Sequence, residues 1–211
     1  MEQEFKWHLP ADRFDALMQY LRENGELLSA QTLRMEAVYY ETVDGLLYRL
    51  GVALRIRREN DRSICCLKRT VHKEGALAQR EEYETEADSL AEGFARLPDA
   101  GAPADLCRLL AAQTFTELAR TRFTRQATLF RFRMPEPFTA EFAADSGALG
   151  GAGKMSPFSE IELELKSGDA ASFFRFADAL AEAFSLIPQP ASKLARAIRT
   201  ARQGGEPHET D

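Results

Sequence analysis

The sequence predicts an α+β fold in which eight antiparallel strands close into a barrel and helices pack against its outside. Two observations lead to this prediction. Polar and apolar residues alternate with a period of two in many short segments, which is typical of strands with two different faces. Between these segments lie turn residues and stretches whose apolar residues recur with the helical period. The chain has 211 residues, 45% of them hydrophobic, so it can bury a sizeable core.

Local sequence patterns indicate where the strands begin and end. Residues 1–8 alternate charged side chains with apolar or uncharged ones, which predicts the first strand. Pro10 then opens a helical stretch that Gly25 ends. Asn60 and Asp61 form a turn between two alternating segments and predict a hairpin. The eight strands are expected at residues 1–8, 33–41, 52–59, 63–70, 79–86, 122–134, 138–145 and 159–166.

Helices and loops are expected between and after these strands. Residues 88–120 read as helical, with breaks at Pro98 and Pro103. Two other segments predict loops and two amphipathic segments predict helices: the loops are expected at 71–79 and 147–154, and the helices at 169–184 and 191–202. We predict a single domain over residues 1–203 and a disordered tail at 204–211.

The composition narrows the class of protein. The formal net charge of −6 argues against a dedicated nucleic-acid binder, which usually carries a basic excess. No apolar run reaches the length of a membrane helix, and residues 1–10 lack the apolar core of a signal peptide. Cys65, Cys66 and Cys107 are odd in number and give no disulfide framework. We therefore expect a cytoplasmic protein with reduced thiols and no membrane partner.

The positions of the charges within the strands carry the functional signal. In any one strand, charged residues on one parity are most simply explained as a face in water. Here the charged parity recurs from strand to strand, and each strand tends to carry one sign. The set is Glu2, Glu4, Lys6, Arg55, Arg57, Lys68, Glu82, Glu84, Arg125, Glu141, Asp145, Glu160, Glu162 and Glu164. If helices cover the apolar outer face of a barrel, these side chains point into its interior.

A barrel interior lined with acids and bases is costly unless it binds ions. Clustered carboxylates without histidine suit hard cations such as Mg²⁺ or Mn²⁺. Clustered arginine and lysine suit phosphate oxygens. The two together predict a site for a metal ion and a polyphosphate.

Several motifs in this order resemble one known family. Glu2-Gln3-Glu4-Phe5-Lys6 has the form ExExK, and further motifs follow at residues 39–44 (YYETVD), 53–58 (ALRIRR), 80–83 (REEY), 158–165 (FSEIELEL) and 192–196 (SKLAR). The combination is similar to the CYTH superfamily, also called triphosphate tunnel metalloenzymes, from residue 2 to about residue 200. The chain most resembles the CYTH half of bacterial inorganic triphosphatases, and we expect no additional CHAD domain.

The resemblance implies a reaction and a role for each residue. It implies hydrolysis of tripolyphosphate to pyrophosphate and phosphate, with two Mg²⁺ or Mn²⁺ ions per site. The implied metal ligands are Glu2, Glu4, Glu162 and Glu164 for one ion and Asp145 with Glu141 for the other. The implied substrate-binding residues are Lys6, Arg55, Arg57, Lys68, Arg125 and Lys193. Of these residues, Lys6, Arg57, Lys68 and Glu162 are expected to act in catalysis.

Some assignments stay open on the sequence alone. Glu160 is explained as well by hydration as by metal binding. Glu82 and Glu84 are better explained as partners that orient Arg55 or Arg57 than as metal ligands. Four further charged residues are expected on the surface: Arg58, Glu59, Arg131 and Arg133.

The resemblance also leaves other functions open. The same family contains thiamine triphosphatases and class IV adenylyl cyclases, although the sequence shows no recognisable reader of a nucleobase. A non-catalytic polyphosphate- or nucleotide-binding module would keep the bases and lose the carboxylates, and here the carboxylates are present. We expect a small triphosphate as the partner and a monomer or homodimer.

Overall fold

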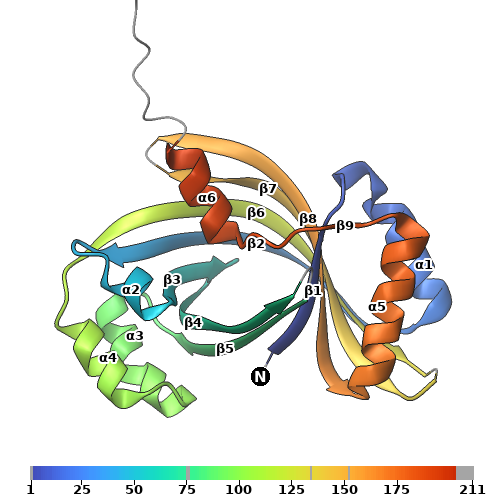
Figure 1. The fold of residues 1–211 in the computed structure, drawn as a ribbon, viewed down its shortest axis with the longest axis horizontal. Helices are drawn as coiled ribbons and strands as arrows, with labels where there is room; N and C mark the ends of the chain where they lie inside the picture. Colours follow the sequence, from blue (N-terminus) through green and yellow to red (C-terminus); the bar gives the residue numbers. More distant parts are fainter. Residues whose placement is uncertain (1, 75–76, 134, 152, 203–211) are drawn as a thin grey trace, which may run out of the picture.

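The computed structural model describes residues 2–74, 77–133, 135–151 and 153–202, and for Glu2, residues 70–74 and residues 77–80 it describes the backbone alone. Figure 1 shows a strongly curved sheet with most of the helices gathered at its two sides. Nine strands are described: β1 (Glu2–His8), β2 (Glu26–Thr42), β3 (Val52–Glu59), β4 (Arg62–Glu74), β5 (Leu77–Glu86), β6 (Phe115–Phe132), β7 (Phe138–Gly151), β8 (Lys154–Gly168) and β9 (Ile187–Pro188).

The described strands form one antiparallel sheet in the order β5-β4-β3-β2-β6-β7-β8-β1-β9. The first strand has two long neighbours. β1 pairs with β8 through residues 4–7, and it pairs with β5 where residues 2–5 lie opposite residues 77–80. Segments that are more than 150 residues apart in the chain therefore lie side by side around β1.

The helices described are α1 (Phe14–Asn24), α2 (Leu46–Leu50), α3 (Leu90–Arg96), α4 (Ala104–Ala111), α5 (Ala170–Phe184) and α6 (Lys193–Arg202), with 3₁₀ turns η1 (Ala11–Arg13) and η2 (Leu97–Ala100). In Figure 1, α1 and α5 lie on one side of the sheet, and α3 and α4 lie on the other. Two apolar clusters match these two groups of helices. Within the described residues, none of the helices combines the length and apolar character that a membrane-spanning segment requires.

The larger cluster joins α1 and α5 to strands β1, β6, β7 and β8. Leu17 of α1 and Phe173 of α5 are fully buried there against Phe130 of β6. Trp7 of β1 lies in the same cluster and stacks on Phe5, with 5.4 Å between the ring centroids. Complete burial of each large apolar side chain stabilises the fold by about 1.5–3 kcal/mol, so this cluster fixes the outer face of the sheet.

Helix α6 packs on a different face of the sheet. Its Ala197 contacts a cluster that contains Ala37 and Tyr39 of β2, Ala119 of β6 and Leu149 of β7. Ala37 and Tyr39 also line the large cavity described below. The helix therefore lies inside the curve of the sheet, where small alanine side chains allow its close approach.

The structure confirms an antiparallel sheet with helices and corrects several details of the prediction. The described sheet has nine strands rather than eight, because Ile187 and Pro188 add the short β9; closure into a barrel stays a prediction. Residues 115–120, expected to be helical, belong to β6, since Phe115 pairs with Thr42 of β2. Tertiary pairing overrides local helical preference there. The predicted tail at 204–211 lies outside the described residues.

Two predicted loops are largely strand. In the segment 71–79, residues 72–74 of β4 pair with residues 77–79 of β5 and lengthen that hairpin. In the glycine-rich segment 147–154, β7 continues to Gly151. A Cβ on Gly147 would collide with the carbonyl oxygen of Arg122, and one on Gly150 with that of Lys154. The glycines therefore mark close backbone approach within the sheet rather than a loop.

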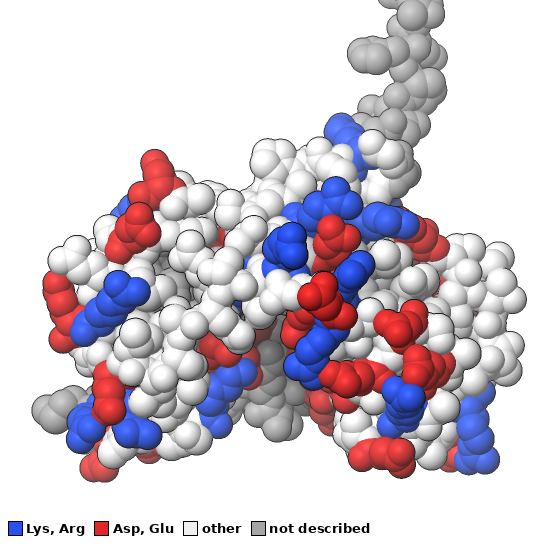
Figure 2. Space-filling model, turned by 180° about the vertical axis from the view of Figure 1, so that it is seen from behind, with Lys and Arg blue, Asp and Glu red and all other residues white. Residues whose placement is uncertain are grey.

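Figure 2 shows the molecule from behind, with charged side chains of both signs over the visible surface. Acidic and basic groups are interspersed there, and the described residues form no broad field of one sign on this face.

Candidate functional site

The curved sheet surrounds a cavity of about 810 Å³. Residues from all eight of the strands β1 to β8 line it, together with residues of α2 and α6. Its charged lining residues carry both signs: Glu4, Lys6, Arg55, Arg57, Glu59, Lys68, Glu82, Glu84, Arg125, Glu141, Glu162, Glu164, Lys166 and Lys193. The volume falls in the range of about 300–1,000 Å³ that is typical of small-molecule sites.

The period of two in the strands explains why these side chains share one cavity. Arg55 and Arg57 on β3 both face it, and so do Glu162 and Glu164 on β8. The residues between them, such as Ile56 and Leu163, belong to the apolar clusters under the helices. The common face that the charge pattern predicts is therefore observed for these strands.

One side of the cavity, which we call the acidic wall, brings carboxylates together by strand register. It comprises Glu4 and Lys6 of β1, Glu141 and Asp145 of β7, and Glu160, Glu162 and Glu164 of β8. Glu164 lies directly opposite Glu4 on one neighbouring strand and opposite Glu141 on the other, and Asp145 lies opposite Glu160. Like charges directly opposite each other destabilise a sheet, so this wall favours the binding of cations.

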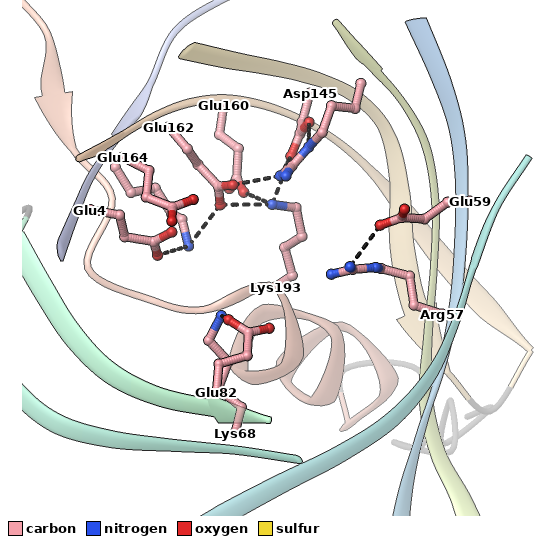
Figure 3. A network of polar contacts seen from close by, with 12 residues as sticks. Glu4, Arg57, Glu59, Lys68, Glu82, Asp145, Glu160, Glu162, Glu164 and Lys193 are labelled. Atoms are coloured by element: carbon pink, nitrogen blue, oxygen red, sulfur yellow. Dashed lines mark hydrogen bonds and ion pairs between the residues drawn. The ribbon is translucent and has the colours of Figure 1, made fainter. Parts of the chain in front are cut away.

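In the structure, basic side chains meet the carboxylates of the acidic wall, and Figure 3 shows Lys193 pointing toward Asp145, Glu160 and Glu162. Glu162 is the centre: its carboxylate lies 3.0 Å from the Nζ atoms of both Lys6 and Lys193 and 2.5 Å from Nη2 of Arg125. Arg125 also forms a two-bond fork with Asp145, with both N–O distances at 2.8 Å. Bidentate pairs of this kind fix geometry as well as charge.

Two of these carboxylates lie behind the cavity surface. Asp145 and Glu160 have no solvent exposure, and neither belongs to the residues that line the cavity. Lys193 pairs with both of them, and Arg196 of α6 pairs with Glu160. Helix α6 is therefore connected to the acidic wall by charge as well as by apolar contact.

The protonation states follow from this network. Burial alone would raise the pKa of Glu162, but Lys193, Lys6 and Arg125 hold that pKa well below its ordinary value. Burial lowers the pKa of Lys193, yet Asp145, Glu160 and Glu162 outweigh it and raise the pKa above its ordinary value. Glu162 and Lys193 are therefore both ionised at neutral pH.

Glu164 behaves in the opposite way, although it lies on the same strand. Burial raises its pKa, Lys166 opposes this, and the carboxylate of Glu141 across the strand raises it further. The net pKa is above its ordinary value. Glu4, Glu164 and Glu141 thus form a row of three carboxylates, in which Lys6 pairs with Glu4 and Lys166 pairs with Glu164.

The other side of the cavity, which we call the arginine wall, comprises Arg55, Arg57 and Glu59 of β3, Cys66 and Lys68 of β4, and Glu82 and Glu84 of β5. Here opposite charges face each other, because Lys68 lies opposite Glu82 in the strand register. Lys68 and Glu82 form an ion pair at 2.5 Å, and Arg55 pairs with Glu82 at 3.3 Å. Arg57 pairs with Glu84 at 3.1 Å. The prediction that Glu82 and Glu84 lie beside these arginines agrees with the contacts.

Both arginines of this wall retain an unused donor. The Nε atoms of Arg55 and Arg57 are buried and have no hydrogen-bond acceptor among the described residues. A buried donor without an acceptor costs about 1–3 kcal/mol, and a phosphate oxygen in the cavity would supply the acceptor. The arginine wall is therefore suited to an anion.

The rim of the cavity is less polar. Tyr48 of α2 belongs to the lining but is 87% exposed. The Glu41 carboxylate accepts hydrogen bonds from the backbone N–H groups of Leu47 and Tyr48, both at 2.9 Å, and so anchors the short helix. An exposed aromatic ring is thereby held at the mouth of a charged cavity.

The structure places most of the predicted site residues in this one cavity. Those that line it are Glu4, Lys6, Arg55, Arg57, Lys68, Arg125, Glu141, Glu162, Glu164 and Lys193. Asp145 lies behind the surface, in contact with Arg125 and Lys193. The side chain of Glu2 lies outside the described part of the chain, and its backbone belongs to β1. The roles given to these residues stay predictions.

The sequence interpretation missed several residues of the cavity. Glu59, expected on the surface, lines it and pairs with Arg57 at 2.6 Å. Lys166 lines it as well and pairs with Glu164 at 2.7 Å. Both lie within the predicted strands 52–59 and 159–166 and share the parity of the predicted residues, so continuing the charged parity to the end of each strand would have found them. Arg196 lies on a helix and has no strand parity, and the motif at residues 192–196 that contains it was the signal available.

The carboxylate oxygens of the cavity are suitable ligands for divalent cations. Among the described residues, Asp145, Glu160 and Glu162 each offer an oxygen within 4.8 Å of the other two, and Cys66, Glu82 and Glu84 form a second such group. Oxygen ligands from carboxylates are those that Mg²⁺ and Mn²⁺ prefer. Glu4, Glu141 and Glu164 add further oxygens on the same wall.

Comparison with known proteins gives an independent view of the fold. The chain matches the CYTH domain family over residues 1–198. A Haemophilus influenzae protein named inorganic triphosphatase is 29% identical over 190 residues, which is 85% of this chain and 49% of that protein. The chain therefore spans about half the length of this curated relative.

Two solved structures support the same fold. A Hippeastrum protein, described as a putative adenylyl cyclase with a dominant triphosphatase activity, aligns with a TM-score of 0.61 and 20% identity over 99% of this chain and 98% of its own. The PH1819 protein of Pyrococcus horikoshii OT3 aligns with a TM-score of 0.58 and 18% identity over 94% of this chain and 99% of its own. The family match covers nearly the whole chain and agrees with the curved sheet and its charged cavity: the chain belongs to the CYTH domain family.

Proposed function

We propose that this protein is a metal-dependent triphosphatase that hydrolyses inorganic tripolyphosphate to pyrophosphate and phosphate inside the cavity. One observation supports this most strongly. Carboxylates are opposed to carboxylates on the acidic wall, while the same cavity presents guanidinium groups with unused donors on the arginine wall. An arrangement of this kind suits a ligand that contains both a divalent cation and several phosphate groups. The curated relative named inorganic triphosphatase points in the same direction.

The residues divide into two groups in this proposal. Glu2, Glu4, Glu162 and Glu164 would hold one Mg²⁺ or Mn²⁺ ion, and Asp145 with Glu141 would hold another. When bound, these ions neutralise phosphate charge and lower the pKa of an attacking water molecule. Lys6, Lys68, Arg55, Arg57, Arg125 and Lys193 would donate to the phosphate oxygens, orient the chain and stabilise charge that grows on the departing pyrophosphate.

The proposal includes the closed tunnel. β1 pairs with β8 and with β5, which supports a ring of the eight long strands around the substrate. Within that ring, Arg55 and Arg57 have alternate positions on β3 and would contact successive phosphate groups. A chain of phosphates would then lie along the cavity rather than across it.

The test is a phosphate-release assay with tripolyphosphate, ATP and thiamine triphosphate, each with Mg²⁺, with Mn²⁺ and with excess EDTA. We expect tripolyphosphate to be hydrolysed far faster than ATP and no turnover in EDTA. Full activity in EDTA would refute the metal dependence. Formation of cyclic AMP from ATP would instead make the protein a cyclase, and binding of tripolyphosphate without hydrolysis would make it a binding module.

The second candidate is hydrolysis of an organic triphosphate. Tyr48 at the rim favours it, because an exposed phenol ring can stack on a nucleobase or another ring while the phosphates lie inside. A preference for ATP or thiamine triphosphate over tripolyphosphate in the same assay would establish this alternative.

A further inference from the structure

We infer that the ammonium group of Lys193 occupies a divalent-cation position on the acidic wall and exchanges with the metal ion when the site is loaded. The inference deepens the proposed function, and it rests on that function for the identity of the ion. Lys193 then has two positions: one between carboxylates in the metal-free protein, and one on the phosphates of the substrate.

The first argument is the geometry around the ammonium. The Nζ atom of Lys193 lies 2.8 Å from Asp145 and 3.0 Å from Glu162, and it also pairs with Glu160. These are the same three carboxylates whose oxygens lie within 4.8 Å of one another (Figure 3). Lys193 donates a hydrogen bond to Glu162 and forms ion pairs with Asp145 and Glu160, while the buried Oε1 atom of Glu160 accepts no hydrogen bond among the described residues. The lysine thus sits between ligands of the two proposed ions, Glu162 of the first and Asp145 of the second, where a small cation would find oxygen ligands from three residues.

The second argument is the cost of leaving this position empty. Asp145 and Glu160 have no solvent exposure. Arg125 pairs with Asp145 and Arg196 pairs with Glu160, and Lys193 is the further cation that pairs with both carboxylates. Removing part of the counter-charge of buried carboxylates is unfavourable, so the departure of Lys193 is costly unless another cation replaces it. Lys193 supplies this part of the counter-charge in the metal-free state and keeps the wall folded.

The third argument is the freedom of the lysine to leave. Lys193 is the first residue of α6, and its side chain lines the cavity. The helix start is fixed independently, because the backbone N–H of Ala195 donates to the Ser192 hydroxyl at 3.1 Å. A lysine has a flexible four-carbon stem, so its ammonium can swing into the cavity while the helix stays in place. Arg196 still pairs with Glu160 after that movement.

The exchange predicts competition that can be measured without turnover. Lys193→Met keeps the apolar stem and removes the charge. Without metal, this variant should be less stable than the wild type, and Mg²⁺ or Mn²⁺ should restore most of the loss. Its dissociation constant for the metal, from calorimetric titration without substrate, should be roughly tenfold lower than that of the wild type, a coupling of ordinary size. Arg199→Met is the matched control: it removes one positive charge from an exposed position on the same helix and should change neither quantity.

The wild-type protein offers a second measurement if Lys193→Met does not fold. Amine-reactive labelling followed by mass spectrometry should find Lys193 protected without metal and several-fold more reactive when Mg²⁺ or Mn²⁺ is bound. Unchanged metal affinity in the variant, or unchanged labelling on metal binding, would overturn the exchange. If neither protein bound either metal at any concentration, the proposed metal-dependent function would fail as well, which is a distinguishable result.

Discussion

The buried charges on the two walls of the cavity are compensated in different ways. On the acidic wall, Glu162 has three basic partners, and the side chains of Lys6 and Lys193 are each 8% exposed. On the arginine wall the contacts are mostly between opposite charges that face each other, and Glu84 is 35% exposed at its side chain. The acidic wall, whose side chains are less exposed, brings like charges together and compensates them with basic side chains that several carboxylates share. The comparison places the proposed exchange of Lys193 with a metal ion on the acidic wall, where several cations share the same carboxylates.

The largest expected effect is on the free energy of unfolding, and it should differ between variants of the two walls. Glu162→Gln removes the common partner of three buried cations and should cost about 3–5 kcal/mol of unfolding free energy, the usual effect of breaking a buried ion pair. Glu84→Gln should cost no more than about 1 kcal/mol, as for an exposed pair. Urea denaturation of the metal-free proteins measures both. Equal losses would show that the two walls do not differ in this way.

The next effect is on kinetics. Glu4→Gln keeps the shape of the side chain and removes a proposed metal ligand, so kcat for tripolyphosphate should fall by about a hundredfold or more at ordinary metal concentrations. Arg57→Ala removes charge-assisted hydrogen bonds to phosphate, so KM should rise by roughly ten- to a hundredfold. Steady-state assays at several metal concentrations distinguish the two. Wild-type kcat in Glu4→Gln would exclude Glu4 as a metal ligand.

A smaller effect distinguishes two residues of one strand through pH. The pKa of Glu162 is lowered by its cations, so its contribution to stability is present at neutral pH and is lost as pH falls below the ordinary value of 4.5 toward the depressed pKa. The pKa of Glu164 is raised, so its contribution is present in acid and is lost as pH rises through that raised pKa. Glu164→Gln should therefore leave the metal-free protein as stable as the wild type at pH 7, or more stable by up to about 1 kcal/mol. Denaturation curves from pH 3 to pH 8 test the signs, and a clear loss of stability at pH 7 would contradict them.

The smallest effect concerns the rim. Tyr48 is 87% exposed, so Tyr48→Ala should leave the free energy of unfolding almost unchanged. The KM for tripolyphosphate should change by no more than about twofold. For ATP or thiamine triphosphate, which carry rings, the KM should rise further if those rings stack on the phenol. An identical change for all three substrates would show that Tyr48 contacts no organic group.

Most of the fold and of the cavity lining could be predicted, because both depend on the period of two. A strand whose charges share one parity points them into the same space, as Arg55 and Arg57 do. The charged parity of β8 ended at Glu164 in the prediction, although Lys166 continues it. Such errors concern the ends of strands, which the sequence marks weakly.

The ion network itself could not be predicted from local patterns. Which carboxylates lie opposite one another depends on the register of β7 and β8, including an irregularity between Thr139 and Ala140. The connection of Asp145 and Glu160 to Lys193 depends on the docking of α6 inside the sheet. Both are long-range arrangements that one strand or helix does not reveal. The glycine-rich segment 147–154 was predicted as a loop for the same reason. Gly147 instead allows a close backbone contact between two strands.

The burial of Trp7 gives the acidic wall an optical reporter. It is the single tryptophan of the sequence, it directly follows Lys6, and it lies opposite Ile161, the residue between Glu160 and Glu162. Its ring is 2% exposed and stacked on Phe5, an environment in which indole emission is sensitive to small shifts of the backbone. The arginine wall contains no indole, so the whole tryptophan fluorescence comes from β1. The emission spectrum of Trp7 is therefore a label-free way to test whether metal ions change this wall of the cavity.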